Sequence, residues 1–310
     1  MTPTRRNFLH AACAAGVGVS VAPQLSRAIE PVHRTDKSHI RLSIAAYSYR
    51  QYLDLKAKPK PTMTLDDFIE TAAEMGLDAV ELTQYYFPTT TTEYLAQLKG
   101  HSTRLGLDVS GTAVGNNFCR TDPAKHKEEI ASVKKWVEHS SRLGAKTIRI
   151  FAGSVEKGDT EEQARARCIE AIQEACDFAA KFGIYLALEN HGGITGNIEQ
   201  MLAIVKAIRH DWFGVNWDTG NFVSADPYAD LEVLAPYAVT VQIKSEIRRT
   251  GKKEKEDADL KRLIGILRSA HYRGYVALEY EAAEEPKIAI PRHIAALQKL
   301  MGCPDGFLRP

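Results

Sequence analysis

Short apolar segments alternate with longer amphipathic ones along most of the chain. Segments such as IRLSIAAYSY (40–49), FGVNWD (213–218) and AVTVQIK (238–244) have the length and the aliphatic and aromatic content of strands, and segments with helical spacing of apolar residues lie between them. Eight such pairs fit within residues 40–302, in the order and size of a barrel of about 250 residues. We therefore predict a single-domain α/β (β/α)8 TIM barrel. A doubly wound open sheet is the alternative, but no Gly-rich phosphate-binding fingerprint follows the first strand.

Glycine marks the point where several predicted helices give way to a strand. Glycine adopts the left-handed conformation that ends many helices, whereas other residues adopt it only with strain. The run Asp159-Thr160-Glu161-Glu162 is a start signal for one long helix. On this pattern we expect helices to end near Gly76, Gly106, Gly144, Gly183 and Gly274.

The first 28 residues are typical of a twin-arginine export signal. Thr4-Arg5-Arg6-Asn7-Phe8-Leu9 precedes an Ala/Gly-rich stretch, and Ser26-Arg27-Ala28 forms a small-x-small cleavage site. We predict a signal peptide over 1–28, a linker over 29–39, the barrel over 40–302 and a tail over 303–310. Residence in the periplasm or outside the cell follows as an expectation, which fractionation of cells that express an Arg5→Lys, Arg6→Lys variant would test.

Composition and charge exclude several classes of protein. The chain is 44% hydrophobic and 25% charged, which is ordinary for a soluble α/β domain. Removing residues 1–28 takes away three arginines and no acid, which leaves a slightly acidic chain. The basic run 248–255 is interrupted by Glu254 and is predicted to be a solvated loop, so no nucleic-acid partner is expected. No segment has the roughly 18–20 apolar residues of a membrane span. Whether the chain forms a homo-oligomer is left open by the sequence.

Four cysteines lie outside the predicted signal: Cys119, Cys168, Cys176 and Cys303. They lack CxxC spacing and are too few for a disulfide framework in a chain of this length. Cys168 and Cys176 lie on one predicted helix, too far apart to pair with each other. We expect buried thiols and leave a pairing of Cys119 or Cys303 open.

Metal-liganding side chains stand near the ends of four predicted strands: Glu189 in LALEN, Asp218 in VNWD, Gln242 in VQIK and Glu279 in VALEY. Side chains alternate along a strand, and bulky aliphatic residues such as Leu186 and Leu188 take the opposite parity. All four candidates therefore face the barrel axis if the aliphatic side packs under the helices. Active sites of such barrels lie at the carboxyl ends of the strands, so the pattern predicts a metal site there.

His191, Lys244 and Glu281 lie two residues beyond these positions and would project toward a substrate. Lys244 would stabilise a developing oxyanion, or form an ion pair with Glu246 or Glu281. His191 would orient or protonate the substrate, or bond to a loop as an ordinary strand-end histidine.

Earlier strands supply weaker candidates. Arg149 would bind a substrate carboxylate or phosphate, or have a structural role at the floor of the barrel. Glu81 and Tyr47 also have the inward parity on their strands.

The motifs LENHGG (188–193), WDTGN (217–221), VQIK (241–244) and LEYE (278–281) resemble those of the xylose-isomerase-like barrel superfamily of sugar isomerases and epimerases. The resemblance implies one divalent metal, held by Glu189, Asp218, Gln242 and Glu279. Many relatives carry His where this chain has Gln242 and Asn221. The resulting oxygen-donor set favours Mn or Mg, with Co or Zn as alternatives.

The resemblance also implies proton removal from carbon next to a carbonyl, with Glu189 and Glu279 as bases and Lys244 and His191 in support. Arg149, Asn221 and Glu281 are the expected substrate-binding residues. We predict a metal-dependent isomerase or epimerase that acts on a sugar or keto-sugar. A lyase of the same superfamily, either 3-dehydroshikimate dehydratase-like or keto-glycoside-cleaving, is one alternative. A non-catalytic carbohydrate-binding barrel is the other, and substrate identity stays open.

Overall fold

The computed structural model describes residues 29–302 except Asp36 and Pro59. Within these residues, eight parallel strands close into a barrel in the order β1-β11-β8-β6-β5-β4-β3-β2. Their bounds are β1 His39–Ala45, β2 Ala79–Thr83, β3 Asp108–Ala113, β4 Thr147–Ile150, β5 Tyr185–Glu189, β6 Phe213–Asp218, β8 Ala238–Ile243 and β11 Arg273–Leu278. The predicted single-domain (β/α)8 barrel is therefore confirmed.

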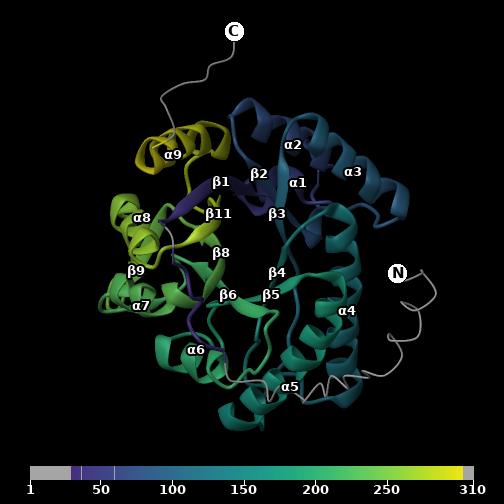
Figure 1. Ribbon diagram of the computed structural model, residues 1–310, viewed down its shortest axis with the longest axis vertical. Helices are drawn as coiled ribbons and strands as arrows, with labels where there is room; N and C mark the ends of the chain where they lie inside the picture. The colour runs from purple at the N-terminus through teal and green to yellow at the C-terminus, as the bar shows by residue number, and fades with distance from the viewer. Residues whose placement is uncertain (1–28, 36, 59, 303–310) are drawn as a thin grey trace, which may run out of the picture.

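Helices surround the barrel on its outside (Figure 1). They are α1 Arg50–Leu53, α2 Leu65–Glu74, α3 Thr92–Arg104, α4 Pro123–Leu143, α5 Glu161–Ala179, α6 Ile198–Val205, α7 Pro227–Leu234, α8 Leu260–Ser269 and α9 Pro286–Met301. The outward face of each strand packs against them. Trp217 on β6 is fully buried in this layer, and its indole Nε1 donates to the carbonyl of Leu231 on α7 at 2.9 Å.

The glycine pattern predicts four of five helix ends. Gly76, Gly106, Gly144 and Gly183 have φ of 67°, 75°, 83° and 67°. The prediction for Gly274 is wrong, because Gly274 lies within β11 and the left-handed residue after α8 is His271, with φ of 51°. Glycine is needed at 274 for space, since a Cβ there would stand 2.6 Å from the hydroxyl of Tyr272.

A small second sheet lies on the loops that leave the carboxyl ends of the barrel. Its order is β10-β9-β7, with bounds Glu256–Asp257, Glu246–Arg249 and Val223–Ser224. The prediction of a solvated loop over 248–255 is therefore wrong at its first residues, which belong to β9. Oppositely charged residues pair across the sheet: Arg249 Nε donates to Glu256 Oε1 at 2.8 Å.

The predicted linker is fixed to the far end of the barrel. The backbone N–H groups of Ile29 and Val32 donate to the carbonyls of Ile208 and Pro236, both at 2.9 Å. These carbonyls precede β6 and β8, opposite the strand ends that carry Asp218 and Gln242. The predicted signal peptide, the tail and Cys303 lie outside the described residues. Over the part of the chain that is described, no helix has the length and apolar character to cross a membrane.

Cys119, Cys168 and Cys176 are buried free thiols, as predicted. The thiol of Cys119 donates to the carbonyl of Ala152 at 3.4 Å, and the neighbouring thiol of Cys168 on α5 lowers the pKa of Cys119. Cys119 therefore lies close to a second thiol, although its spacing in the sequence did not predict which one.

A buried histidine on α4 should make the stability of the fold depend on pH. His139 is 7% exposed, and within the described residues neither of its ring nitrogens has a hydrogen-bond partner. Burial, with the charges of Lys135 and Arg142, lowers the pKa of His139. The folded chain then resists protonation, while the unfolded chain gains a proton below about pH 6.5.

We therefore expect the free energy of unfolding to fall as the pH drops from about 7 toward 5, and a His139→Phe variant to lose part of that dependence. Urea unfolding at several pH values measures both slopes. A His33→Gln change at an exposed position is the matched control. Equal slopes in His139→Phe and wild type would rule out His139 as a source.

Candidate active site

The four predicted metal ligands meet at the carboxyl ends of neighbouring strands. Glu189, Asp218, Gln242 and Glu279 are 2%, 0%, 0% and 5% exposed. Asp218 on β6 stands level with Gln242 on β8, which in turn pairs with Ala277 on β11. Gln242 also reaches across the barrel to Glu81 on β2. The inward parity predicted from the alternation of side chains is thus observed.

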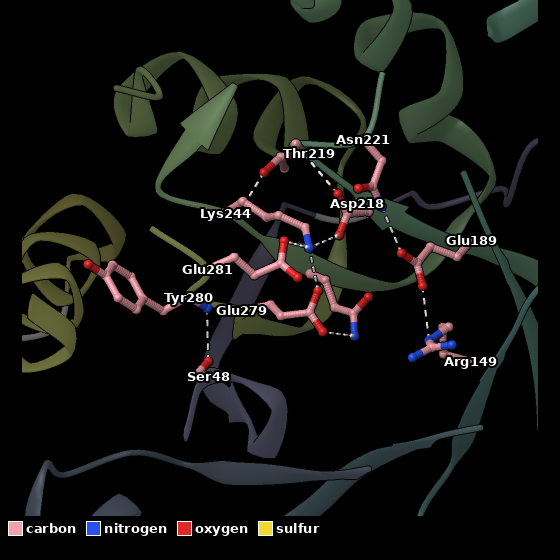
Figure 2. Close-up of polar contacts among 12 residues, drawn as sticks. Ser48, Arg149, Glu189, Asp218, Thr219, Asn221, Lys244, Glu279, Tyr280 and Glu281 are labelled. Atoms are coloured by element: carbon pink, nitrogen blue, oxygen red, sulfur yellow. Dashed lines mark hydrogen bonds and ion pairs between the residues drawn. The ribbon is translucent and has the colours of Figure 1, made fainter. Parts of the chain in front are cut away.

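Lys244 places its ammonium among three of the acids (Figure 2). Its Nζ lies 2.7 Å from Glu279 Oε2, 2.7 Å from Glu281 Oε2 and 3.4 Å from Asp218 Oδ2. Burial would lower the pKa of Lys244, but these carboxylates together raise it well above its usual value. The ion pair expected with Glu281 is therefore present. The alternative partner Glu246 lies near Lys255 instead, at 3.7 Å.

Glu189 is held by two of the three residues that were expected to bind substrate, Arg149 and Asn221. Arg149 Nε lies 2.9 Å from Glu189 Oε2, and Asn221 Nδ2 donates to Glu189 Oε1 at 2.8 Å. Arg149 also donates to the carbonyl of Val114 at 2.8 Å, and its guanidinium lies over the ring of Phe151. Burial raises the pKa of Glu189 well above its usual value in spite of Arg149. Arg149 and Asn221 thus bind a carboxylate of the chain itself, where the sequence predicted that they bind substrate.

The amide of Gln242 turns its nitrogen toward the acids. Nε2 donates to Glu81 Oε1 at 2.6 Å and to Glu279 Oε1 at 3.3 Å, while Oε1 accepts from Asn216 Nδ2 at 2.6 Å. The orientation of an amide follows from its hydrogen-bond network. Burial, then the charge of Glu279, raises the pKa of Glu81 to about 7. Glu81 was a weak candidate from parity alone, and its contact with Gln242 makes it part of the cluster.

His191 lies apart from the acids on the exposed rim. Its ring contacts that of Phe151 at a tilt of 43°, with centroids 4.3 Å apart, and its backbone N–H donates to Thr195 Oγ1. The loop that follows packs against the loop after β4, so that a Cβ at Gly193 would stand 2.1 Å from the carbonyl oxygen of Gly153. The second glycine of LENHGG, Gly193, therefore allows the close approach of two loops at the mouth.

The cluster contains more acidic than basic side chains. Among the described residues, its five carboxylates face two basic groups, Arg149 and Lys244. Burial raises the pKa of Asp218 to about 7, and in the described part of the chain its Oδ2 is buried without a hydrogen-bond donor. The carboxylates are Glu81, Glu189, Asp218, Glu279 and Glu281.

The chemistry of this donor set fits a hard divalent cation, which prefers carboxylate and amide oxygens. The buried Oδ2 of Asp218, which accepts no hydrogen bond in the described part of the chain, supports the fit. In the present arrangement, however, no three His, Cys, Asp or Glu side chains of the described residues are disposed as ligands. The acids gather around Lys244 instead, and Gln242 presents its nitrogen. The predicted ligand set stays a prediction.

Comparisons with known proteins agree with this fold. D-Psicose 3-epimerase, in a crystal structure determined with D-fructose, superposes with a TM-score of 0.65 at 18% identity, over 84% of this chain and 94% of that one. The IolI protein with a bound zinc atom gives 0.66 at 21%, over 84% and 96%. A xylose isomerase-like barrel from Mycobacterium smegmatis in complex with magnesium gives 0.65 at 17%, over 85% and 97%.

No protein of curated function matches this sequence. The family described as "Xylose isomerase-like TIM barrel" matches residues 69–300, which is most of the chain. The protein therefore belongs to the xylose isomerase-like TIM barrel family.

Proposed function

We propose that this protein is a divalent-metal-dependent isomerase or epimerase that removes a proton from the carbon next to the carbonyl of a sugar or keto-sugar. One observation carries the proposal: two buried carboxylates, Glu189 and Glu279, stand on separate strands of one mouth, with the ammonium of Lys244 beside Glu279. A similar barrel is a ketose 3-epimerase, and two others bind zinc or magnesium.

The residues of the chain have distinct tasks in this reaction. A cation held by Glu189, Asp218, Gln242 and Glu279 would polarise the substrate carbonyl. The carboxylate of Glu279 accepts the proton from carbon, and Lys244 donates a hydrogen bond to the oxygen on which charge develops. Arg149 and Asn221 each hold one oxygen of Glu189, which fixes the direction in which that carboxylate points.

A lyase that works by β-elimination is the second candidate. It needs a base for the proton and an acid for the leaving group, and environments that push two pKa values apart supply such a pair. Burial would raise the pKa of Glu281, but Lys244 outweighs burial and lowers it, whereas burial raises the pKa of Glu189. Two carboxyl groups at one mouth whose pKa values are shifted in opposite directions would suit elimination.

Exchange with deuterated water tests both candidates. Metal-free protein is supplied with Mn²⁺ or Mg²⁺ and incubated in D₂O with a panel of ketoses and 3-keto-glycosides, which are followed by NMR. For an isomerase or epimerase we expect deuterium on the carbon next to the carbonyl together with a rearranged sugar. A new carbon–carbon double bond with release of water or an alcohol identifies the lyase. Deuterium incorporation that is equal in the Asp218→Ala variant would contradict the metal-dependent mechanism.

A further inference from the structure

We propose that Lys244 is an internal counter-cation that competes with a divalent metal for Asp218 and Glu279, so that metal binding releases its ammonium to the substrate. This inference rests on the metal requirement of the proposed function and adds a role for one residue in controlling it.

The ammonium of Lys244 lies among three carboxylates, two of which accept its hydrogen bonds. It carries three N–H bonds, and three carboxylates lie around it, at 2.7 Å for Glu279, 2.7 Å for Glu281 and 3.4 Å for Asp218. Lys244 is only 5% exposed, so little water is available to replace these partners. Two of its N–H bonds are donated to Glu279 and Glu281, so the ammonium is held by acids of the chain rather than by a substrate oxygen.

Two of the three partners are also predicted metal ligands. A metal that takes up oxygens of Asp218 and Glu279 withdraws them from Lys244, and like charges in a buried site repel strongly. Glu281 is not among the predicted ligands and is 27% exposed on its side chain, nearer the rim than Asp218 or Glu279. Lys244 can therefore keep Glu281 as its partner when it leaves the other two.

The backbone of Lys244 does not have to move for this exchange. Its N–H donates to Thr219 Oγ1 at 2.8 Å, and the N–H of Thr219 donates to the carbonyl of Gln242 at 3.1 Å. These bonds fix the start of the side chain between β6 and β8. Only the flexible methylene chain of Lys244 has to change its rotamers, which is compatible with a reversible switch.

Metal titration of Lys244→Met tests the competition directly. We expect calorimetry to show Mn²⁺ binding about 10-fold tighter or more in this variant than in wild type, because a competing charge is gone. Without metal the variant should unfold at a lower temperature than wild type, and Mn²⁺ should raise its unfolding temperature more. Lys255→Met is the matched control, since Lys255 lies outside the cluster near Glu246, and it should bind Mn²⁺ as wild type does.

A second measurement uses the unaltered protein, in case the variant does not fold. Acetylation by a water-soluble N-hydroxysuccinimide ester, read by mass spectrometry, should modify Lys244 faster when Mn²⁺ is present, while Lys255 changes little. Equal or weaker Mn²⁺ binding in Lys244→Met, or labelling of Lys244 that Mn²⁺ does not increase, would overturn the proposal.

The outcomes also separate this proposal from the proposed function. If Mn²⁺ binds Lys244→Met but not wild type, the competition is supported in its strongest form. If no variant binds Mn²⁺, Mg²⁺ or Zn²⁺, both proposals fail. If the affinities shift as expected and no sugar exchanges deuterium, the competition stands and the proposed reaction fails.

Discussion

A Glu279→Gln variant is expected to turn over its sugar about 10²- to 10⁴-fold more slowly than the wild type, with KM changed only a few-fold. A base acts in the transition state, so its loss lowers kcat rather than substrate binding. The amide that replaces it can still coordinate a cation through its oxygen. Steady-state kinetics and solvent deuterium exchange, each with metal content measured on the same sample, check this expectation.

Glu81→Gln is a useful companion to Glu279→Gln. Glu81 belongs to the same cluster and accepts from Gln242 Nε2 at 2.6 Å, but the proposed reaction gives it no proton to take. Glu81→Gln should therefore lower kcat less than Glu279→Gln does. If Glu279→Gln keeps its metal and exchanges deuterium at a near-normal rate, Glu279 is only a ligand, and the base is His191 or Glu281.

The largest loss of stability is expected from Trp217→Ala, which should lower the free energy of unfolding by about 3–5 kcal/mol. Trp217 is fully buried between β6 and α7, and its truncation leaves a cavity and removes the donor to the Leu231 carbonyl. Because Asp218 directly follows Trp217, the truncation should also make the residues at the mouth of the barrel more mobile. Denaturant unfolding of the metal-free protein measures the effect.

Trp217→Phe separates the two causes. It keeps most of the apolar volume and removes the indole donor, while the Leu231 carbonyl still accepts from the N–H of Ala235. The lost hydrogen bond therefore costs about 0.5–1.5 kcal/mol. We therefore expect a clearly smaller loss than for Trp217→Ala. A loss below about 1 kcal/mol in the alanine variant would mean that the layer between β6 and α7 collapses to fill the cavity.

The parts of this structure that depend on local regularities could be predicted from the sequence. Strand parity placed Glu189, Asp218, Gln242 and Glu279 on the inward face because alternation is a property of a single strand. Helix ends at Gly76 and Gly144 followed from the same kind of local rule. Gly274 does not follow this rule. A side chain at this position would collide with the Tyr272 hydroxyl, and the pattern of helix ends carries no signal for such a contact.

The partners within the site could not be predicted, because they depend on distance across the barrel. Parity showed that Lys244 and Arg149 point inward. It did not show that Lys244 forms an ion pair with Glu279 or that Arg149 forms one with Glu189. A long basic side chain can pair with any of several acids within its reach, and the pair that forms depends on the positions of all the charges. Glu81 had the right parity on β2, yet only the closed barrel brings it to Gln242.

The hydrogen bonds of Ile29 and Val32 to the underside of the barrel have a practical consequence. Anything joined to the chain immediately ahead of Ile29 leaves from the end of the barrel opposite Lys244 and its acids. A protein attached to a sensor surface through that point would turn its mouth toward the solution. Sugar and metal titrations on immobilised protein should then give the same affinities as titrations in free solution.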